Sequence, residues 1–410
     1  MADADSNALS PSRIDDDPVA GDPFFRLPDD SDWNACIGKQ GNEENYIDGY
    51  IEAASELANA VIEKKMYGQR DTLVLPILYN ARHAVELVQK FAINRLFAAG
   101  LLMSRAPGDH DILSHWRLLS GANIGDEELR HCIAALDPFV KSLTRIDDDG
   151  QELRYHLNSE EEPSLATYSL ANLEVIRESL ATLSKLISAL RYRTIDYIDE
   201  RRTGACTSRL SRRDLVWIAK TMPPLIRWTE GVFDERKKIV KQRFGLSNTQ
   251  FSNALDVIKA NREMKALVGG ETSLHFLPDD LLVWVVRQWR KRHPRREPND
   301  DATIVKFDKR TFEAMREDAR IMGEVVSAVE KRLTNEQIAE LQTIYYLGRD
   351  RWFPEFYNEE VEMTIRQHTV ENDLRKQIRH LMTKTNFLEA IIAALPRLGR
   401  PSLAARISQL

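Results

Sequence analysis

The chain has 410 residues, of which 43% are apolar and 29% charged, a composition typical of a globular protein with a sizeable core. Its net charge of −6 is uneven: residues 1–200 carry 19 Lys and Arg against 35 Asp and Glu, and residues 201–410 carry 38 against 28. Three widely spaced cysteines, an acidic start and no apolar run longer than residues 281–286 argue against a disulfide framework, a targeting peptide and a membrane span, and favour a cytoplasmic protein.

The first half predicts a tail followed by a helical domain. Residues 1–43 are rich in Asp, Pro and Gly without apolar periodicity, which predicts a disordered acidic tail. From residue 44 onward the apolar spacing is helical, and we assign residues 44–200 to one domain. Its predicted helices cover about 44–62, 71–103, 109–119, 126–143 and 164–197, with a short extended piece or hairpin over 147–163.

The second half is also helical in its pattern. Residues 201–211 are polar and predict a linker, and residues 212–410 are assigned to a second helical domain. Thr334 and Gln337 predict a capping box, and Gly348 predicts the end of that helix. Strand-type alternation is almost absent, so the predicted fold class is all-α. The predicted helices cover 212–243, 248–268, 279–292, 309–332, 335–348, 358–382 and 385–394.

A charged stripe interrupts the apolar second helix. Arg82, Glu86 and Lys90 follow one another at a spacing of four residues, which places them on one face. Charges in a buried helix need partners, so the stripe is either a structural ladder or a polar pocket within the core. Arg154 and His156 share a face if their segment is extended, and they could line the same pocket or pin the loop.

Three ordered elements give a family resemblance. They are RHAVELVQK after the segment DTLVLPILYN, GDHDILSHW at 108–116, and DDDGQELRYHL at 147–157. Together they resemble bacterial HEPN-like helical domains over about residues 44–197. The resemblance implies a helical bundle used in phage defence, toxin–antitoxin and RNA-processing systems. It also implies that active members are dimeric, metal-independent endoribonucleases with an Arg followed after four to six residues by His.

The chain departs from that motif at its central helix. His83 follows Arg82 directly, and the Arg-to-His spacing occurs elsewhere about as often as chance predicts. One of these matches, Arg105 to His110, crosses a Pro and a Gly and therefore does not lie on one helix. The others are Arg287 to His293 and Arg375 to His380.

Two further patterns have both a functional and a structural interpretation. A basic string with Trp284 and Trp289 could contact phosphates and stack on bases, or could complement a helix C-terminus. Asp111 and His115 could bind a metal ion, or could form hydrogen bonds to the first turn of a helix. The basic string consists of Arg287, Arg290, Lys291, Arg292 and Arg295.

Two functional hypotheses follow. In the first, the protein is a HEPN-like effector that binds RNA through the basic string and cleaves it by attack of the ribose 2′-OH, without cofactor or metal. In the second, it is a catalytically inactive HEPN-like scaffold that binds a partner protein. Both expect a homo-oligomer. The candidate catalytic residues are Arg82, His83, Glu86, Arg154 and His156.

Overall fold

The computed structural model describes residues 22–25, 27, 32–38, 41–157, 161–294 and 309–410. Within these ranges the protein is helical, and its only β-type pairing is an isolated bridge between Leu157 and Pro163. The predicted all-α class is therefore confirmed. Most of the predicted tail and Arg295 of the basic string lie outside the described residues. Of the described helices, none is long and apolar enough to cross a membrane.

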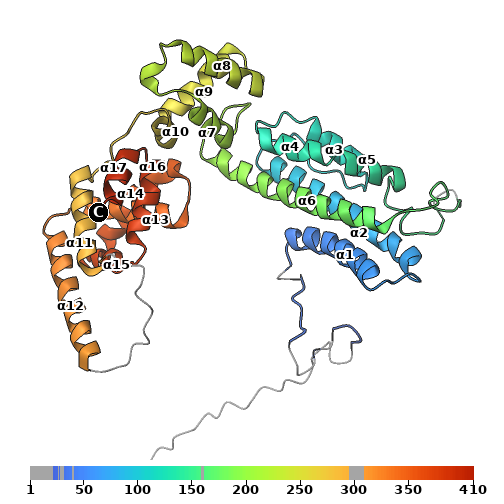
Figure 1. Cartoon of the computed structure of the whole chain (residues 1–410), viewed down its shortest axis with the longest axis horizontal. Coiled ribbons are helices and arrows are strands. Elements are labelled where there is room, and N and C mark those ends of the chain that lie inside the picture. Colours follow the sequence, from blue (N-terminus) through green and yellow to red (C-terminus); the bar gives the residue numbers. More distant parts are fainter. Residues whose placement is uncertain (1–21, 26, 28–31, 39–40, 158–160, 295–308) are drawn as a thin grey trace, which may run out of the picture.

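The first unit is a bundle around one central helix. The second helix is buried almost all round, from Ile77 to Leu96, because it packs between the first and the sixth. Its Pro76 lies in the second turn, as predicted. The other helices of this unit cover its remaining sides (Figure 1). The bounds are α1 Glu43–Glu63, α2 Arg70–Ala98, α3 Ile112–Ser120, α4 Glu127–Ala135, α5 Asp137–Ile146 and α6 Leu173–Arg202.

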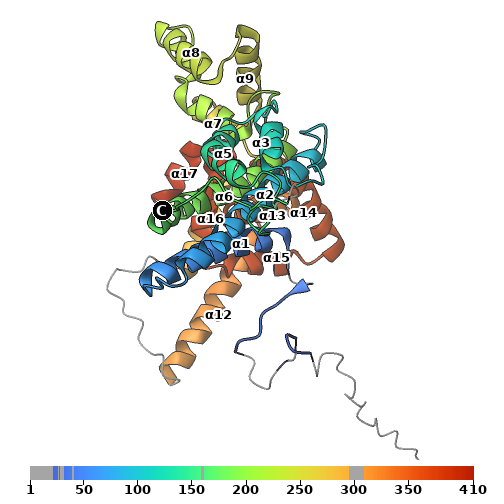
Figure 2. The same ribbon diagram turned by 90° about the vertical axis from the view of Figure 1, so that its right-hand side faces the viewer.

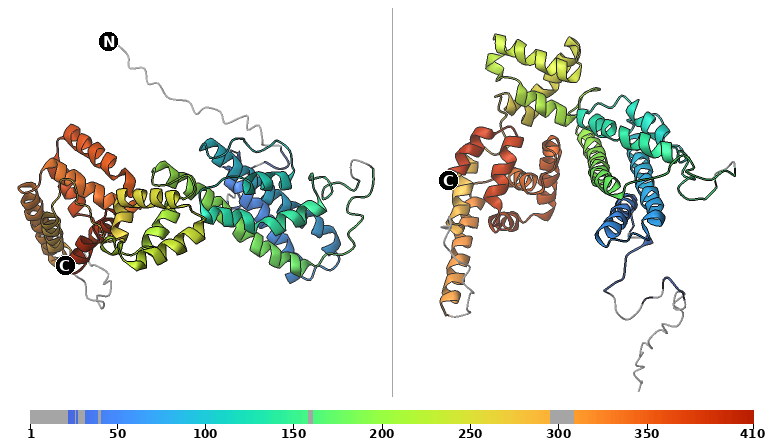
Figure 3. Two further views of the ribbon diagram at one scale, coloured as in Figure 1. Left: turned by 90° about the horizontal axis from the view of Figure 1, so that it is seen from above. Right: turned by 45° about the vertical axis from the view of Figure 1, so that its right-hand side comes forward.

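The second half contains two hydrophobic cores. One core joins the short helices of residues 205–268, and the other joins the helices of residues 274–407. Figure 3 shows the first, middle and third units following one another along the molecule. The bounds are α7 Arg212–Thr221, α8 Gly231–Phe244, α9 Asn248–Ala260, α10 Arg262–Leu267, α11 Asp279–Arg292, α12 Lys309–Glu330, α13 Asn335–Asp350, α14 Tyr357–Glu371, α15 Leu374–Met382, α16 Phe387–Arg397 and α17 Pro401–Ser408.

Several predicted helix bounds are wrong for local reasons. The predicted helix over 212–243 is divided, because Pro223 and Pro224 follow α7 and cannot continue it. The predicted helix over 248–268 is also divided, because Asn261 adopts an extended conformation and caps α10. The long helix predicted from residue 164 begins only at Leu173, where Asn172 caps it.

Gly348 does not end its helix, contrary to the sequence prediction. It lies inside α13, which continues to Asp350 and ends at the left-handed Arg351. A Cβ at position 348 would overlap the backbone carbonyl oxygen of Ala390 on α16. This glycine is therefore required by the close crossing of two helices rather than by a turn. The capping box of Thr334 and Gln337 at the start of α13 is confirmed.

Ion pairs join the first unit to the middle one. Glu127, in the first turn of α4, accepts a bidentate pair from Arg243 at the end of α8. Glu128 pairs with Arg213 of α7. A Cβ at Gly125 would lie 2.8 Å from the carbonyl oxygen of Ser208, so the two backbones meet closely there. The segment predicted as a linker, 201–211, therefore meets the first unit at Ser208.

Candidate functional site

The polar stripe of α2 begins at Arg82, a buried arginine whose three guanidinium nitrogens all donate hydrogen bonds. Arg82 is 2% exposed, and its guanidinium lies within a ring of acceptors. Nε donates to the carbonyl oxygen of Asp147 at 2.8 Å, and Nη2 donates to those of His110 at 2.7 Å and Asp148 at 3.1 Å. Nη1 donates to Glu86 at 3.3 Å. Arg82 therefore ties two loops to the central helix and has no surface from which to reach a substrate.

The loop that follows α5 is shaped for this arginine. The Asp147 carboxylate accepts from the amides of Gly150 at 2.7 Å and Glu152 at 3.2 Å, which folds the loop into a tight turn. Gly150 has φ +84, and a Cβ there would lie 3.2 Å from Nη1 of Arg82. A glycine meets both requirements, because it adopts positive φ without strain and leaves room for the guanidinium.

Glu86 is the centre of the stripe. Its carboxylate is 3% exposed and also accepts from Lys90 and from Nδ1 of His110, each at 2.8 Å. Burial by itself raises the pKa of Glu86, but the hydrogen bonds from Lys90 and His110 outweigh burial and leave the pKa below its ordinary value. Glu86 is therefore ionised at neutral pH and holds an ammonium and an imidazole at the edge of the core.

His83 lies beside this carboxylate and contacts two tyrosine rings. Its ring is 23% exposed, contacts Tyr50 edge-on at 4.3 Å and stacks on Tyr79 at 5.9 Å. Nδ1 is 3.9 Å from Glu86, too far for a hydrogen bond. Burial lowers the pKa of His83, and the positive charges of Arg82 and Lys90 act in the same direction against the attraction of Glu86. His83 is thus a neutral imidazole at neutral pH.

His110 is the site residue that sequence reasoning missed. It lies in the loop before α3, is half-exposed, and its hydrogen bond to the ionised Glu86 assigns a proton to Nδ1. The available signal is the spacing from Arg105 to His110. The two residues do not lie on one helix, because Pro107 and Gly108 separate them. The Arg105 guanidinium lies over the ring of Phe97.

Lys90 completes the open edge of the site. Its ammonium donates to Glu86 and, at 2.6 Å, to the carbonyl oxygen of Asp109. An ammonium has three N–H donors, so one remains after these two bonds. The side chain is 21% exposed. The structure therefore places two imidazoles and one cation around a single buried carboxylate.

The two residues predicted from the loop after α5 have different positions. The Arg154 side chain approaches this region, lying over the Tyr79 ring at 5.9 Å and donating to the carbonyl oxygen of Gly150. His156 is exposed, and within the described part of the chain its ring makes no contact with the stripe. The segment forms turns rather than an extended strand, so the two side chains do not share a face.

The basic string on α11 is largely engaged in packing and pairing. Arg292 forms a bidentate pair with Asp318 of α12 at 2.8 and 3.0 Å, and Arg290 lies over the ring of Trp289. Trp289 is a core residue whose indole N–H donates to the Lys384 carbonyl. Lys291 donates to Gln288, whereas Arg287 is exposed.

The remaining histidine patterns are structural. Asp111 caps α3 by accepting from the amides of Leu113 and Ser114, and His115 is buried with Nε2 at 3.1 Å from Asp109. His380 shares a hydrogen bond with Tyr346 at 2.8 Å. A search of the described residues finds no group of three or more His, Cys, Asp or Glu side chains that could hold a metal ion.

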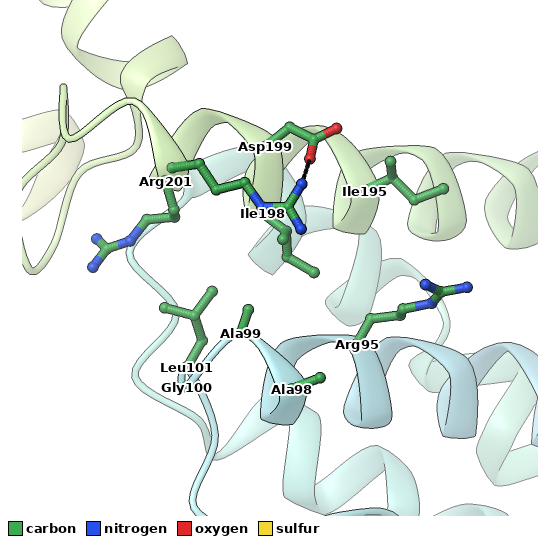
Figure 4. A pocket seen from close by; sticks show the side chains of 10 residues that line it. Arg95, Ala98, Ala99, Gly100, Leu101, Ile195, Ile198, Asp199 and Arg201 are labelled. Carbon is green, nitrogen blue, oxygen red and sulfur yellow. Dashed lines mark hydrogen bonds and ion pairs between the residues drawn. The ribbon is translucent and has the colours of Figure 1, made fainter.

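A cavity of about 670 Å³ lies elsewhere in the first unit, where the ends of α2 and α6 meet. Figure 4 shows Ile195 and Ile198 of α6 across the cavity from Ala98, Ala99 and Leu101, with Arg95 at one side. Asp199 forms an ion pair with Arg202 at 2.9 Å. The cavity contains no histidine, and its one carboxylate is already paired. This cavity therefore offers no pair of acid–base groups like the one at Glu86.

Comparison with known proteins adds no relative: no family model, no curated protein and no solved structure matches the chain.

Proposed function

We propose that the first unit binds RNA and cleaves it by metal-independent transesterification, as the HEPN-like resemblance implies. The observation that carries the proposal is the shared carboxylate: Glu86 holds His110 at 2.8 Å and Lys90 at 2.8 Å, with His83 beside it at 3.9 Å. Acid, base and cation are the three groups that this reaction needs.

The two imidazoles suit proton transfer. The base removes the proton of the ribose 2′-OH, the resulting oxygen attacks the adjacent phosphorus, and the acid protonates the departing 5′-oxygen. The bond from phosphorus to the 5′-oxygen breaks, so the product carries a 2′,3′-cyclic phosphate. His83 is the base, because burial keeps it neutral. The acid is His110 in its imidazolium form, in which Nδ1 donates to Glu86 and Nε2 carries the proton that is transferred. The free N–H of Lys90 stabilises the charge on phosphorus.

This assignment differs from the site predicted from sequence. His83 keeps its role as the base. Glu86 keeps its role as the carboxylate that orients the groups around it. Arg82 becomes a positioning residue, because its hydrogen bond to the carbonyl oxygen of His110 fixes that loop. His110 and Lys90 enter the site from the structure.

The test measures cleavage of a synthetic RNA pool by the full chain with EDTA present. His83→Ala and His110→Ala should each reduce the rate by about 10²–10⁴-fold, the usual contribution of an acid or base. The matched control is His131→Ala, which removes an exposed histidine of α4. A 2′-deoxy substrate should remain intact. Wild-type protein without activity, or activity retained in both site variants, would contradict the proposal.

The second candidate is an inactive HEPN-like scaffold that binds a partner protein. The burial of Arg82 favours it, because a guanidinium that is 2% exposed and already bonded to three carbonyl oxygens has no surface from which to contact phosphate. In that case the wild type does not cut RNA, and His110→Ala changes neither RNA cleavage nor assembly. Light scattering of the full chain at tens of micromolar separates the candidates further, because the composite-site mechanism of the resemblance requires a dimer.

A further inference from the structure

The middle unit is small and strongly basic. Residues 205–268 carry 13 Lys and Arg against 6 Asp and Glu, whereas the first half of the chain is acidic. Its two longest helices, α8 and α9, form the part that projects furthest from the other units in both Figure 1 and Figure 2. An excess of positive charge on a projecting unit is typical of a surface that meets nucleic acid.

A three-residue turn joins α8 to α9. Gly245 follows α8 in the left-handed conformation with φ +62, and its amide bonds to the carbonyl of Lys241. Leu246 is buried, and Ser247 begins α9 with a capping box completed by Gln250. Two helices joined by a short turn that contains glycine are typical of a helix-turn-helix.

The buried residues around the turn fix the two helices relative to each other. α7 is the third helix of this arrangement, because it packs against both α8 and α9 and contributes to the same hydrophobic core. The rings of Phe233 on α8 and Phe251 on α9 meet at 6.2 Å. The buried positions on both sides of the glycine are Val240, Phe244, Leu246, Phe251 and Ala254.

The outer face of α9 carries small polar side chains. Asn248, Thr249, Ser252 and Asn253 are all exposed and lie on the first two turns of the helix. Their amides and hydroxyls are the groups that pair with base edges, with Asn suited to adenine and Ser or Thr to several bases. Asp256, further along this face, is paired with Lys259 at 3.8 Å.

Cations flank this face from α8. Lys241 donates to Asn248 at 2.8 Å, and Lys237 lies 5.7 Å from the ring of Phe251, so both ammonium groups lie beside the start of α9. Arg243 is not available, because it pairs with Glu127 of the first unit. Lysines beside a recognition helix contact the phosphates that border the groove.

We propose that the middle unit is a helix-turn-helix module that binds double-stranded DNA, with α9 in the major groove and Lys237 and Lys241 on the phosphates. The duplex is DNA because the major groove of B-form DNA admits a helix, whereas that of A-form RNA is too narrow. This module is separate from the site at Glu86, so it does not depend on RNA cleavage.

The experiment measures binding of the full chain to labelled duplexes by fluorescence anisotropy. It starts at about 50 mM salt, where phosphate contacts are strong. Selection from a randomised duplex pool should enrich a short sequence. Ser252→Ala combined with Asn253→Ala should weaken binding to the selected duplex about tenfold or more and leave binding to random duplex almost unchanged. Both residues are exposed, so thermal melting should not change.

A second variant tests the phosphate contacts. Lys237→Ala combined with Lys241→Ala should weaken binding to every duplex and reduce the slope of log affinity against log salt by about two. The control is Lys185→Ala, an exposed lysine of α6. Absence of sequence enrichment, or unchanged affinity in both double variants, would overturn the proposal. Loss of single-stranded RNA binding with no duplex binding would assign the surface to RNA instead. His110→Ala should not affect duplex binding, which keeps this outcome distinct from that of the cleavage site.

Discussion

Two buried arginines of the first unit have opposite surroundings. Arg82 on α2 and Arg193 on α6 are each 2% exposed. Arg193 donates to both oxygens of Asp126 at 2.9 and 2.6 Å and to both oxygens of Glu200 at 2.6 and 3.0 Å. Arg82 donates mainly to backbone carbonyls, with Glu86 as its hydrogen-bonded carboxylate.

The difference shows how a buried carboxylate becomes available for other partners. Around Arg193 the two carboxylates are used by the guanidinium, so the cluster is closed and serves the joint between α6, α4 and α7. Around Arg82 the carbonyls satisfy most of the guanidinium, which leaves Glu86 free to hold Lys90 and His110. The same residue type therefore supports a structural joint in one place and an open polar site in the other.

Breaking the closed cluster should have the largest effect on stability. Arg193→Met leaves Asp126 and Glu200 buried without their cation, and we expect the free energy of unfolding to fall by about 3–5 kcal/mol. Urea denaturation measures this. A loss below about 1 kcal/mol would show that water replaces the arginine, and would remove the contrast with Arg82.

Breaking the open cluster should cost somewhat less. Arg82→Met removes the donor of three carbonyls, but Glu86 keeps Lys90 and His110, so we expect a loss of about 3 kcal/mol. Under the proposed function, RNA cleavage should also fall, because the loop that carries His110 loses its anchor. An Arg82→Met protein that melts like wild type would contradict the role of Arg82 as the tie between two loops.

The stability of the contacts between α4, α6 and α7 should also depend on pH through Asp214, in the first turn of α7. Burial raises the pKa of this carboxyl to about 6, and the nearby charge of Asp126 acts in the same direction. Because the folded pKa lies above the unfolded value, this group's contribution to stability is complete below about pH 4 and is lost as the pH rises through 6. Asp214→Asn should therefore gain stability relative to wild type between about pH 4 and 7, by an amount of order 2 kcal/mol.

The measurement is a series of unfolding curves at several pH values. Asn keeps an oxygen that can accept from the amides of Ser211 and Glu127, which bond to Asp214 at 3.0 and 3.3 Å. Asp126 is the opposite case: burial acts to raise its pKa, but Arg193 lowers it below its ordinary value, so its contribution is lost as the pH falls. A pH-independent difference between the Asp214→Asn variant and wild type would contradict the raised pKa of Asp214.

The smallest expected effect concerns the loop over Arg82. Gly150→Ala places a Cβ at a residue with φ +84 and 3.2 Å from the guanidinium, so we expect a loss of about 1–2 kcal/mol. Thermal melting measures it, with Gly108→Ala as the control, because the structure leaves open space around Gly108. Equal melting temperatures for the two variants would show that the loop yields to the added methyl group.

Much of the site and fold could be read from the sequence because periodicity and caps are local. The spacing of Arg82, Glu86 and Lys90 predicted one face of a buried helix whose charges need partners. Thr334 and Gln337 predicted a helix start. His110 could not be found in this way, because its approach to Glu86 depends on a loop fold that Arg82 holds from a distant position in the chain.

What the sequence by itself determined is the all-α class, the central buried helix and the presence of charges that need partners within it. Local hydrogen bonding and apolar spacing decide these features. Only the tertiary structure decided which partner each charge takes, that Gly348 serves a helix crossing with α16, and that residues 212–410 hold two cores. These depend on contacts between residues far apart in the chain, whose packing and electrostatics no local pattern contains.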